Sequence, residues 1–251
     1  SRSNSSSAGW SQNFLKQLIF NYFFNKADKI IVNSLDFKRE MDKKYKINTE
    51  CIFNPFEFEK IQKLSKKKVV NIFKSQNLKL LAIGRLTEQK DFITLLKSIK
   101  NLKRNNVELI IIGKGREKQK LIEYVSENDL SKKVKFLGYK KNPFPYLRQA
   151  DILIMTSKFE GSPNVLVEGL FLKKFVISTN CPTGPREILN KGKFGKLLKV
   201  GDHKNITKYL ENFKFSRINK LKIKKGFISV KRFDYKNNCN KYLKLINKFI
   251  K

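Results

Sequence analysis

Two carboxylates, those of Glu160 and Glu168, are separated by seven residues and flank a helix-start signal. Ser162 is a typical N-cap residue and Pro163 a typical first helical residue. The apolar run before them, residues 151–156, is typical of a buried strand. A strand should therefore lead through a short loop into the N-terminus of a helix. Because the free backbone N–H groups and the dipole of such a terminus attract anions, the segment predicts an anion site beside two carboxylates.

The expected helix carries Asn164 and Glu168 four positions apart, and so on one face. The rest of its surface is apolar and is formed by Val165, Leu166, Val167 and Leu170. A carboxylate on a mostly buried helix is costly unless it is hydrogen-bonded. Glu168 therefore has either a protein partner, as in a structural salt bridge, or a ligand rich in hydroxyl groups.

A second group of candidate residues is Gly84-Arg85 and Lys90, which follow the apolar run 78–83. Gly84 lets the backbone turn directly after a strand, so Arg85 should lie at the end of that strand. Lys90 should lie near the start of a helix that extends to about residue 104. Two fixed cations in such a place can neutralise a diphosphate without a metal ion. The alternative is that both are ordinary solvated side chains of a lysine-rich chain.

Gly113 and Gly115 form a near-match to the glycine pattern of dinucleotide-binding proteins. Lys118 replaces the third glycine, and no acidic residue stands where ribose recognition would need one, which disfavours NAD. We interpret the two glycines as a tight turn near the ligand. The sequence has no Walker phosphate-binding pattern and no Asp-x-Asp pair. We therefore expect no metal and no cofactor, and phosphate should be bound by Arg, Lys and backbone groups.

Nucleophilic catalysis and metal binding have little support in the sequence. His203 is the only histidine and is predicted to lie in a surface loop, which leaves no Ser/His or Cys/His pair. The three cysteines, Cys51, Cys181 and Cys239, stand far apart without metal-ligand spacing, and their odd number cannot all pair. A reducing cytoplasm is the simplest setting.

The elements that position these residues follow from the apolar periodicity. Six apolar runs alternate with helical segments, at residues 78–83, 107–112, 134–137, 151–155, 175–178 and 195–200. This alternation predicts an α/β fold of Rossmann-like type, with a parallel sheet and helices on both faces. Ligands of such sheets bind beyond the carboxyl ends of the strands, where both candidate groups are expected.

The chain before residue 65 is expected to be a separate α/β portion. Its predicted elements are a loop at 1–9, an amphipathic helix at 10–26, a strand at 27–34, a helix at 35–45, a strand and turn at 51–56, and a helix at 57–64. The charged run 65–68 suits a linker, so we place a domain boundary between about residues 65 and 77.

The formal net charge of +34 restricts the partners of this chain. Only nine of its 55 basic residues are arginines, the residue type on which sequence-specific nucleic-acid-binding proteins depend. Nucleic acid is therefore disfavoured as a partner. Attraction to an anionic membrane surface is favoured, because each lysine near the leaflet adds about 1 kcal/mol without a shaped site. No segment qualifies as a signal peptide or a membrane span. We therefore expect a peripheral protein on the inner face of the cytoplasmic membrane.

The motifs together resemble a known family. The two spaced glutamates, Gly84-Arg85 and Lys90 occur in the same order as in GT-B fold retaining glycosyltransferases of family 4, in their C-terminal nucleotide-sugar domain. The runs 136–139 (FLGY) and 181–189 (CPTGPREIL) add to the resemblance. It implies an incomplete N-terminal acceptor-side domain with linker at 1–70, a nucleotide-sugar domain at 71–232, and at 233–251 a helix that crosses back to the N-terminal domain.

The resemblance also implies roles for the candidate residues. Arg85 and Lys90, next to Gly84, would bind the donor diphosphate, and Glu168 would hydrogen-bond the ribose hydroxyls. The backbone around Tyr139 would contact the base. The group expected to face the transferred sugar and the phosphates comprises Glu160 and the backbone of Gly161, Ser162, Asn164 and Val165. The reaction would be displacement at the anomeric carbon with retention, in which the cations and the helix N-terminus stabilise the leaving diphosphate.

Two departures from the family pattern bear on the substrate. Residues 183–186 (TGPR) replace the Gly-Gly pair that is usual in this loop of the family. The loop sequence found here is similar to that of bacterial transferases that add hexoses or N-acetylhexosamines to lipid-diphosphate-linked oligosaccharides. The family's glycine-rich N-terminal loop and acceptor-site histidine have no match, so we expect a fragment that binds a UDP-sugar but does not transfer it. The alternative is a non-catalytic basic module that binds nucleic acid or a sugar nucleotide.

Overall fold

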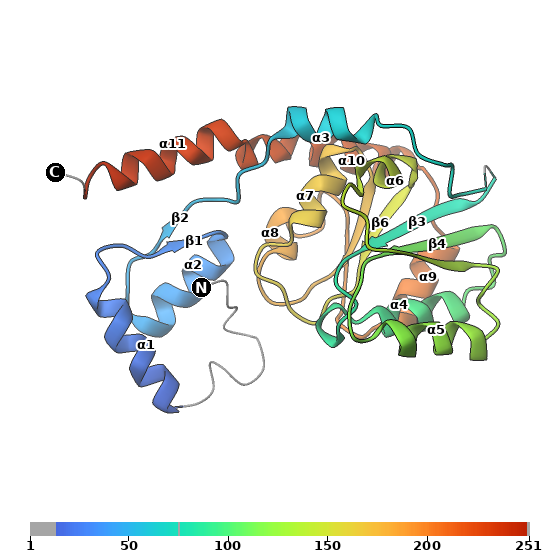
Figure 1. Ribbon diagram of the computed structural model, residues 1–251, viewed down its shortest axis with the longest axis horizontal. Helices are drawn as coiled ribbons and strands as arrows, with labels where there is room; N and C mark the ends of the chain where they lie inside the picture. Colours follow the sequence, from blue (N-terminus) through green and yellow to red (C-terminus); the bar gives the residue numbers. More distant parts are fainter. Residues whose placement is uncertain (1–13, 75, 250–251) are drawn as a thin grey trace.

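The computed structural model describes residues 14–74 and 76–249 (Figure 1). The elements, in chain order, are α1 (Phe14–Lys26), β1 (Ile31–Val32), α2 (Leu35–Tyr45), β2 (Glu50–Cys51), α3 (Phe58–Ser65), β3 (Leu78–Ile83), η1 (Glu88–Lys90), α4 (Phe92–Lys100), β4 (Val107–Ile112), α5 (Lys118–Glu127), β5 (Val134–Gly138), α6 (Phe144–Gln149), β6 (Ile152–Met155), α7 (Asn164–Phe171), β7 (Phe175–Thr179), α8 (Pro185–Ile188), β8 (Lys196–Leu198), α9 (His203–Glu211), α10 (Arg217–Ser229), η2 (Val230–Phe233) and α11 (Tyr235–Ile246). None of the helices in these ranges is long and apolar enough to cross a membrane.

The central sheet has six strands in the order β5-β4-β3-β6-β7-β8, and every neighbouring pair is parallel. The predicted parallel α/β sheet is thus confirmed. β3 and β4 have the predicted bounds, whereas β8 is shorter than the apolar run 195–200 suggested. β4 lies inside the sheet, and all of its residues are buried because helices cover both faces.

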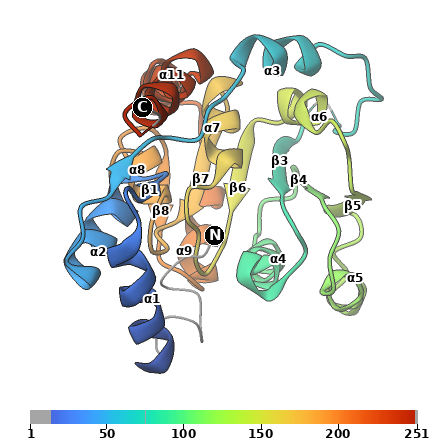
Figure 2. The same cartoon turned by 60° about the vertical axis from the view of Figure 1, so that its left-hand side comes forward.

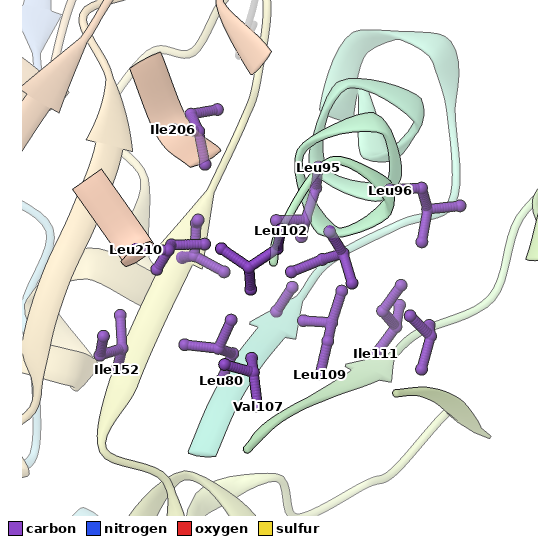
Figure 3. Packing of buried hydrophobic residues seen from close by; sticks show 14 of the residues in the cluster. Leu80, Leu95, Leu96, Leu102, Val107, Leu109, Ile111, Ile152, Ile206 and Leu210 are labelled. Carbon is purple, nitrogen blue, oxygen red and sulfur yellow. The ribbon is translucent and has the colours of Figure 1, made fainter. Parts of the chain in front are cut away.

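Two apolar clusters hold the helices against the sheet. One cluster joins the strands to α4, α5 and α9, and the other joins them to α3, α6, α7 and α8. Figure 3 shows part of the first cluster, where Leu80 and Leu109 of the sheet lie near Leu102 and near Leu210 of α9. Because strand side chains alternate between faces, neighbouring residues such as Leu80 and Leu81 belong to different clusters.

The N-terminal portion contains a parallel pair of short strands, β1 and β2, beside α1 and α2 (Figure 2). Two chain segments that pass between this portion and the main sheet are joined by backbone hydrogen bonds. The amide of Phe56 donates to the carbonyl of Phe233 at 2.8 Å, and the amide of Tyr235 donates to the carbonyl of Phe56 at 3.1 Å. Both crossing segments are therefore fixed to each other.

Several predicted bounds were wrong in ways that matter for the site. Ser162 does not cap α7: Pro163 has an extended ψ of 103° and occupies the N-cap position, so the helix begins at Asn164. Lys90 lies in η1, because Asp91 adopts a left-handed conformation with φ of 48° and separates η1 from α4. His203 is not in a loop but begins α9.

The N-terminal elements also differ from the prediction. Only Ile31–Val32 of the predicted strand 27–34 forms a strand. The apolar residues of α1 are spread round its axis and do not form a single amphipathic face. The predicted loop at 1–9 and the first part of the predicted helix at 10–26 lie outside the described residues.

The glycines after β4 allow the loops after β3 and β4 to approach closely. A Cβ on Gly113 would lie 1.8 Å from the carbonyl oxygen of Gly84, and a Cβ on Gly115 would lie 2.2 Å from that of Leu86. The amide of Leu86 donates to the carbonyl of Lys114 at 2.9 Å. These two glycines are therefore required because the loop that carries Arg85 packs directly on them.

Gly115→Ala is expected to lower the free energy of unfolding by about 1 to 3 kcal/mol, because the added Cβ overlaps the backbone of Leu86. Urea unfolding measures this loss. The control is Gly161→Ala, where nothing lies within 4 Å of the added Cβ and the change should stay below about 0.5 kcal/mol. Equal stability of the two variants would contradict the close approach.

Candidate active site

The candidate site lies where the strand order reverses. β3 and β6 are neighbours at the centre of the sheet, with β4 and β5 outward of β3 and with β7 and β8 outward of β6. The connections after β3 and β6 therefore leave toward opposite sides and open a crevice at the carboxyl ends of the strands. Gly84-Arg85 follows β3, and Glu160 follows β6. The two groups of candidate residues are thus brought together by the topology.

Lys90 and Glu160 form an ion pair across this crevice. The Lys90 Nζ lies 2.5 Å from Oε1 of Glu160, and the two side chains are only 15% and 9% exposed. The Ser157 hydroxyl donates to the same carboxylate oxygen at 2.6 Å. The aliphatic stem of Lys90 lies over Gly84, with Cε 3.5 Å from the position that a Cβ would occupy. Lys90 is therefore not a solvated surface lysine.

Further hydrogen bonds join the segments that follow β3 and β6. The Lys158 amide donates to the Gln89 carbonyl at 2.8 Å, and Nε2 of Gln89 donates to the Phe159 carbonyl at 2.8 Å. The Thr156 hydroxyl donates to the Asp91 carbonyl at 2.9 Å. The backbone around the ion pair is therefore held on both sides, which fixes where Lys90 and Glu160 meet.

Arg85 differs from Lys90 in its surroundings. Its side chain is exposed, and within the described part of the chain its guanidinium has no hydrogen bond or ion pair. Its planar donor fork is suited to a phosphate group. Of the two predicted cations, Arg85 is the one whose charge is uncompensated by the described residues, whereas the charge of Lys90 is balanced by Glu160.

Glu168 lies half-buried on α7. Burial raises the pKa of its carboxyl group from an ordinary value of 4.5 to about 7. Among the described residues no side chain forms a salt bridge or hydrogen bond with it, so the alternative of a structural salt bridge is not supported. A carboxylate in this state favours a ligand that donates hydrogen bonds.

The loop that leads into α7 packs against the segment before α8. Gly184 has φ of 85°, and a Cβ there would lie 2.6 Å from the carbonyl oxygen of Gly161 and 3.2 Å from Cα of Ser162. The Thr183 hydroxyl donates to the carbonyl of Glu160. The threonine that departs from the family pattern therefore helps to hold the loop after Glu160.

Asn164 and Val165 begin α7 and have different surroundings. The Asn164 Oδ1 accepts from Nδ2 of Asn54 at 2.7 Å, and Oδ1 of Asn54 accepts from Nδ2 of Asn33 at 3.2 Å. Asn164 therefore connects α7 to the N-terminal portion by a chain of amides. Val165 is half-buried and packs against the second apolar cluster, so only its backbone is suited to contact a ligand.

Tyr139 stands just beyond the end of β5 and is 62% exposed. The Lys114 Nζ lies 5.2 Å from the centre of its ring. An exposed aromatic ring beside the carboxyl edge of the sheet offers a flat apolar surface. The arrangement is compatible with a contact to a planar group, and the role of Tyr139 stays a prediction.

A cleft of about 720 Å³ lies between the start of α2 and the residues around α8. On its wall, Oε2 of Glu187 accepts from the amide of Asp36 at 3.2 Å, which places a carboxylate at the N-terminus of α2. Burial raises the pKa of Glu187. The charged residues that line the cleft are the acidic Asp36 and Glu187 and the basic Arg39, Arg186, Lys191 and Arg232, and Arg39 forms an ion pair with Asp36.

Sequence reasoning missed several residues that organise the site. Thr156 ends the apolar run 151–156 and Ser157 directly follows it, so the end of the predicted strand indicated the position of both residues. Gln89, Asn54 and Thr183 had no such signal, because their partners lie at least 21 residues away in the chain. The part of the chain that the structure describes contains no cluster of three or more His, Cys, Asp or Glu residues placed to hold a metal ion.

Comparison with known sequences gives the following relatives. The chain is 41% identical over 181 residues to an uncharacterized glycosyltransferase of Methanocaldococcus jannaschii, covering 68% of this chain and 44% of the relative. It is 28% identical over 227 residues to N-acetylgalactosamine-N,N'-diacetylbacillosaminyl-diphospho-undecaprenol 4-alpha-N-acetylgalactosaminyltransferase of Campylobacter jejuni, covering 86% of this chain and 61% of the relative. The chain thus spans about half the length of these curated relatives.

Solved structures share the fold. The Anabaena protein HepE in complex with UDP and glucose superimposes with a TM-score of 0.81 at 18% identity, over 93% of this chain and 67% of that one. The sheet and its flanking helices therefore match those of GT-B glycosyltransferases. The sequence model described as Glycosyl transferases group 1 matches residues 62–226, the region that contains the whole six-stranded sheet. On this evidence, the chain belongs to the glycosyl transferases group 1 family.

Proposed function

We propose that the protein containing this chain is a retaining glycosyltransferase of family 4. It transfers a hexose or N-acetylhexosamine from a UDP-sugar to a lipid-linked saccharide. The observation that carries the proposal is the half-buried carboxylate of Glu168, which has no side-chain partner among the described residues and lies on α7, the helix that follows the Glu160 loop at the carboxyl edge of the sheet. A nucleotide sugar combines hydroxyl groups, which Glu168 can accept, with a diphosphate, which Arg85 and the α7 N-terminus can bind.

The diphosphate is the part of the donor best matched by charge. Arg85 supplies a guanidinium whose charge no described residue compensates, and the first backbone amides of α7 lack intrahelical acceptors. We assign the diphosphate to these groups together with the loop 161–163. The structural relative HepE is described as a complex with UDP and glucose, which supports a UDP-sugar as the donor class.

Lys90 and Glu160 are assigned to the reacting end of the donor. Glu160, whose carboxylate also accepts a hydrogen bond from Ser157, holds the ammonium of Lys90 in one place, so the position of this cation does not have to be organised during the reaction. A preorganised cation stabilises the negative charge that develops on the leaving diphosphate. In this proposal Glu160 orients Lys90 and lines the sugar pocket, and no protein carboxylate forms a covalent intermediate.

The acceptor is assigned from the Campylobacter relative, whose name describes a diphospho-undecaprenol-linked saccharide. The cleft between α2 and α8 is lined by residues of the N-terminal portion and of the main sheet, and basic residues outnumber acidic ones in this lining, which suits a phosphorylated acceptor. Because the chain spans about half the length of its curated relatives, transfer should be tested with the longer protein. Donor-dependent transfer to lipid-linked saccharide separates an enzyme from a module that only binds sugar nucleotide.

Glu168→Ala is expected to weaken UDP-sugar binding by about 1.5 to 3 kcal/mol, the range for hydrogen bonds to a charged group. Isothermal titration calorimetry on the 251-residue chain measures the change. Glu127→Ala is the matched control, because Glu127 is exposed on α5, at the edge strand of the sheet. Unchanged affinity in a normally folded Glu168→Ala variant would remove the ribose role.

Arg85→Ala is expected to lower turnover at least about tenfold, because the diphosphate loses the charged hydrogen bonds that the Arg85 guanidinium donates to it. The loss should appear in kcat/KM of the longer protein, with Arg104→Ala as a control at the opposite end of β4.

We also propose that transfer needs no metal ion. Full activity should therefore remain after chelation, and activity that is lost with chelator and restored by a divalent cation would contradict this assignment.

Glu168 should also make stability depend on pH. Its folded pKa of about 7 lies above the ordinary 4.5, so the folded state holds the proton more tightly and is favoured at low pH. As pH rises from 4.5 to 7, the parent should lose about 1 to 3 kcal/mol of unfolding free energy relative to Glu168→Gln. Urea unfolding of both proteins across this range tests it. A pH-independent difference would show that Glu168 is not desolvated.

A further inference from the structure

Helix α10 presents large apolar side chains to solvent. Ile218, Leu221 and Ile228 are 69%, 48% and 53% exposed, and Phe215, just before the helix, is 43% exposed. The spacing of these residues places them on one side of the helix. Several large apolar groups exposed together on one helix face are unusual for a surface that faces only water.

The opposite side of α10 already packs against the protein. Gly226 is buried, and a Cβ there would lie 2.7 Å from Leu170 of α7 and 3.4 Å from Phe194. The Lys222 Nζ donates to the carbonyl of Gly195 at 3.0 Å. The helix is therefore fixed in its rotation, and it cannot turn its exposed apolar side chains inward without losing these contacts.

The charge on α10 is of one sign. The helix has no acidic residue, and its five basic residues are Arg217, Lys220, Lys222, Lys224 and Lys225. Lys214 and Lys231 follow the same pattern at its two ends. Exposed apolar side chains among lysines, without any carboxylate, are the features of helices that lie in the interface of an anionic membrane.

We propose that Phe215 and the exposed face of α10, formed by Ile218, Leu221 and Ile228 with the exposed lysines Lys220, Lys224 and Lys225, dock on an anionic phospholipid bilayer. The apolar side chains enter the boundary between headgroups and acyl chains, and the ammonium groups lie at the level of the lipid phosphates. This docking would bring the enzyme to its acceptor, because a lipid-linked acceptor lies in such a bilayer. In that respect alone the inference rests on the proposed function. Vesicle binding itself requires no transfer activity.

Charge and apolarity together favour lipid over other partners. Nucleic acid would use the lysines but leave the four apolar side chains without a partner, and α10 has a single arginine. α1 also exposes Leu18, Ile19, Tyr22 and Phe23, yet Lys26 is the one charged residue among its described side chains. The described side chains of α1 therefore offer an anionic surface fewer positive charges than the five basic residues of α10 do.

The test is sedimentation of the 251-residue chain with vesicles of phosphatidylcholine, with or without phosphatidylglycerol. We expect binding that requires phosphatidylglycerol and weakens as salt rises. Ile218→Ser/Leu221→Ser/Ile228→Ser should reduce the partition coefficient about tenfold or more. Because these side chains are exposed, the variant should fold normally, as circular dichroism and thermal unfolding can verify.

Charge reversal gives a second and independent variant. Lys224→Glu/Lys225→Glu should also weaken binding about tenfold or more. Its control, Lys132→Glu/Lys135→Glu, makes the same charge change at the β5 edge of the sheet and should bind nearly as the parent does. Parental binding by both α10 variants would overturn the proposal. So would binding that is lost in Leu18→Ser/Tyr22→Ser but kept in the α10 variants, or α10 variants that lose binding to duplex DNA instead of vesicles.

Discussion

The ion pair between Lys90 and Glu160 joins the two halves of the sheet at the point on which the candidate site depends. Both side chains are largely removed from water, so each charge would be costly without the other. The Ser157 hydroxyl adds a hydrogen bond to the shared oxygen, and Gln89 and Thr156 hold the surrounding backbone. The pair thereby fixes the loop that carries Arg85 relative to the loop that leads into α7.

Three glutamates near the carboxyl edge of the sheet have different roles because their surroundings differ. Glu160 is paired with a lysine, Glu187 accepts a hydrogen bond from the start of α2, and Glu168 has no side-chain partner among the described residues. Glu187 and the amides of Asn54 and Asn164 also connect the N-terminal portion to the main sheet. Among the described residues, Oε1 of Glu187 is buried without a hydrogen-bond partner, and Glu168 is the one of the three whose whole carboxyl group has no side-chain partner.

The amino-acid sequence by itself determined the α/β class, the six strands and the chain order of the chemical residues. The reason is local: buried parallel strands appear as short, continuous apolar runs, and β3 and β4 have the bounds that these runs predicted. The glutamate spacing and the Gly84-Arg85 pair were also visible in the sequence. The strand order was not, since alternation of strands and helices is compatible with several arrangements.

Only the tertiary structure decided which charges meet. Lys90 and Glu160 lie 70 residues apart in the chain, and their pairing depends on β3 and β6 being neighbours. For the same reason the sequence could not show that the Arg85 guanidinium has no partner among the described residues, or that Glu168 is half-buried with a pKa near 7. The first residue of α7 also depends on the tertiary structure, because the backbone conformation of Pro163 depends on a loop packed against Gly184. Residue type and spacing identified the candidates, whereas burial and contact, which are properties of the packed chain, assigned their roles.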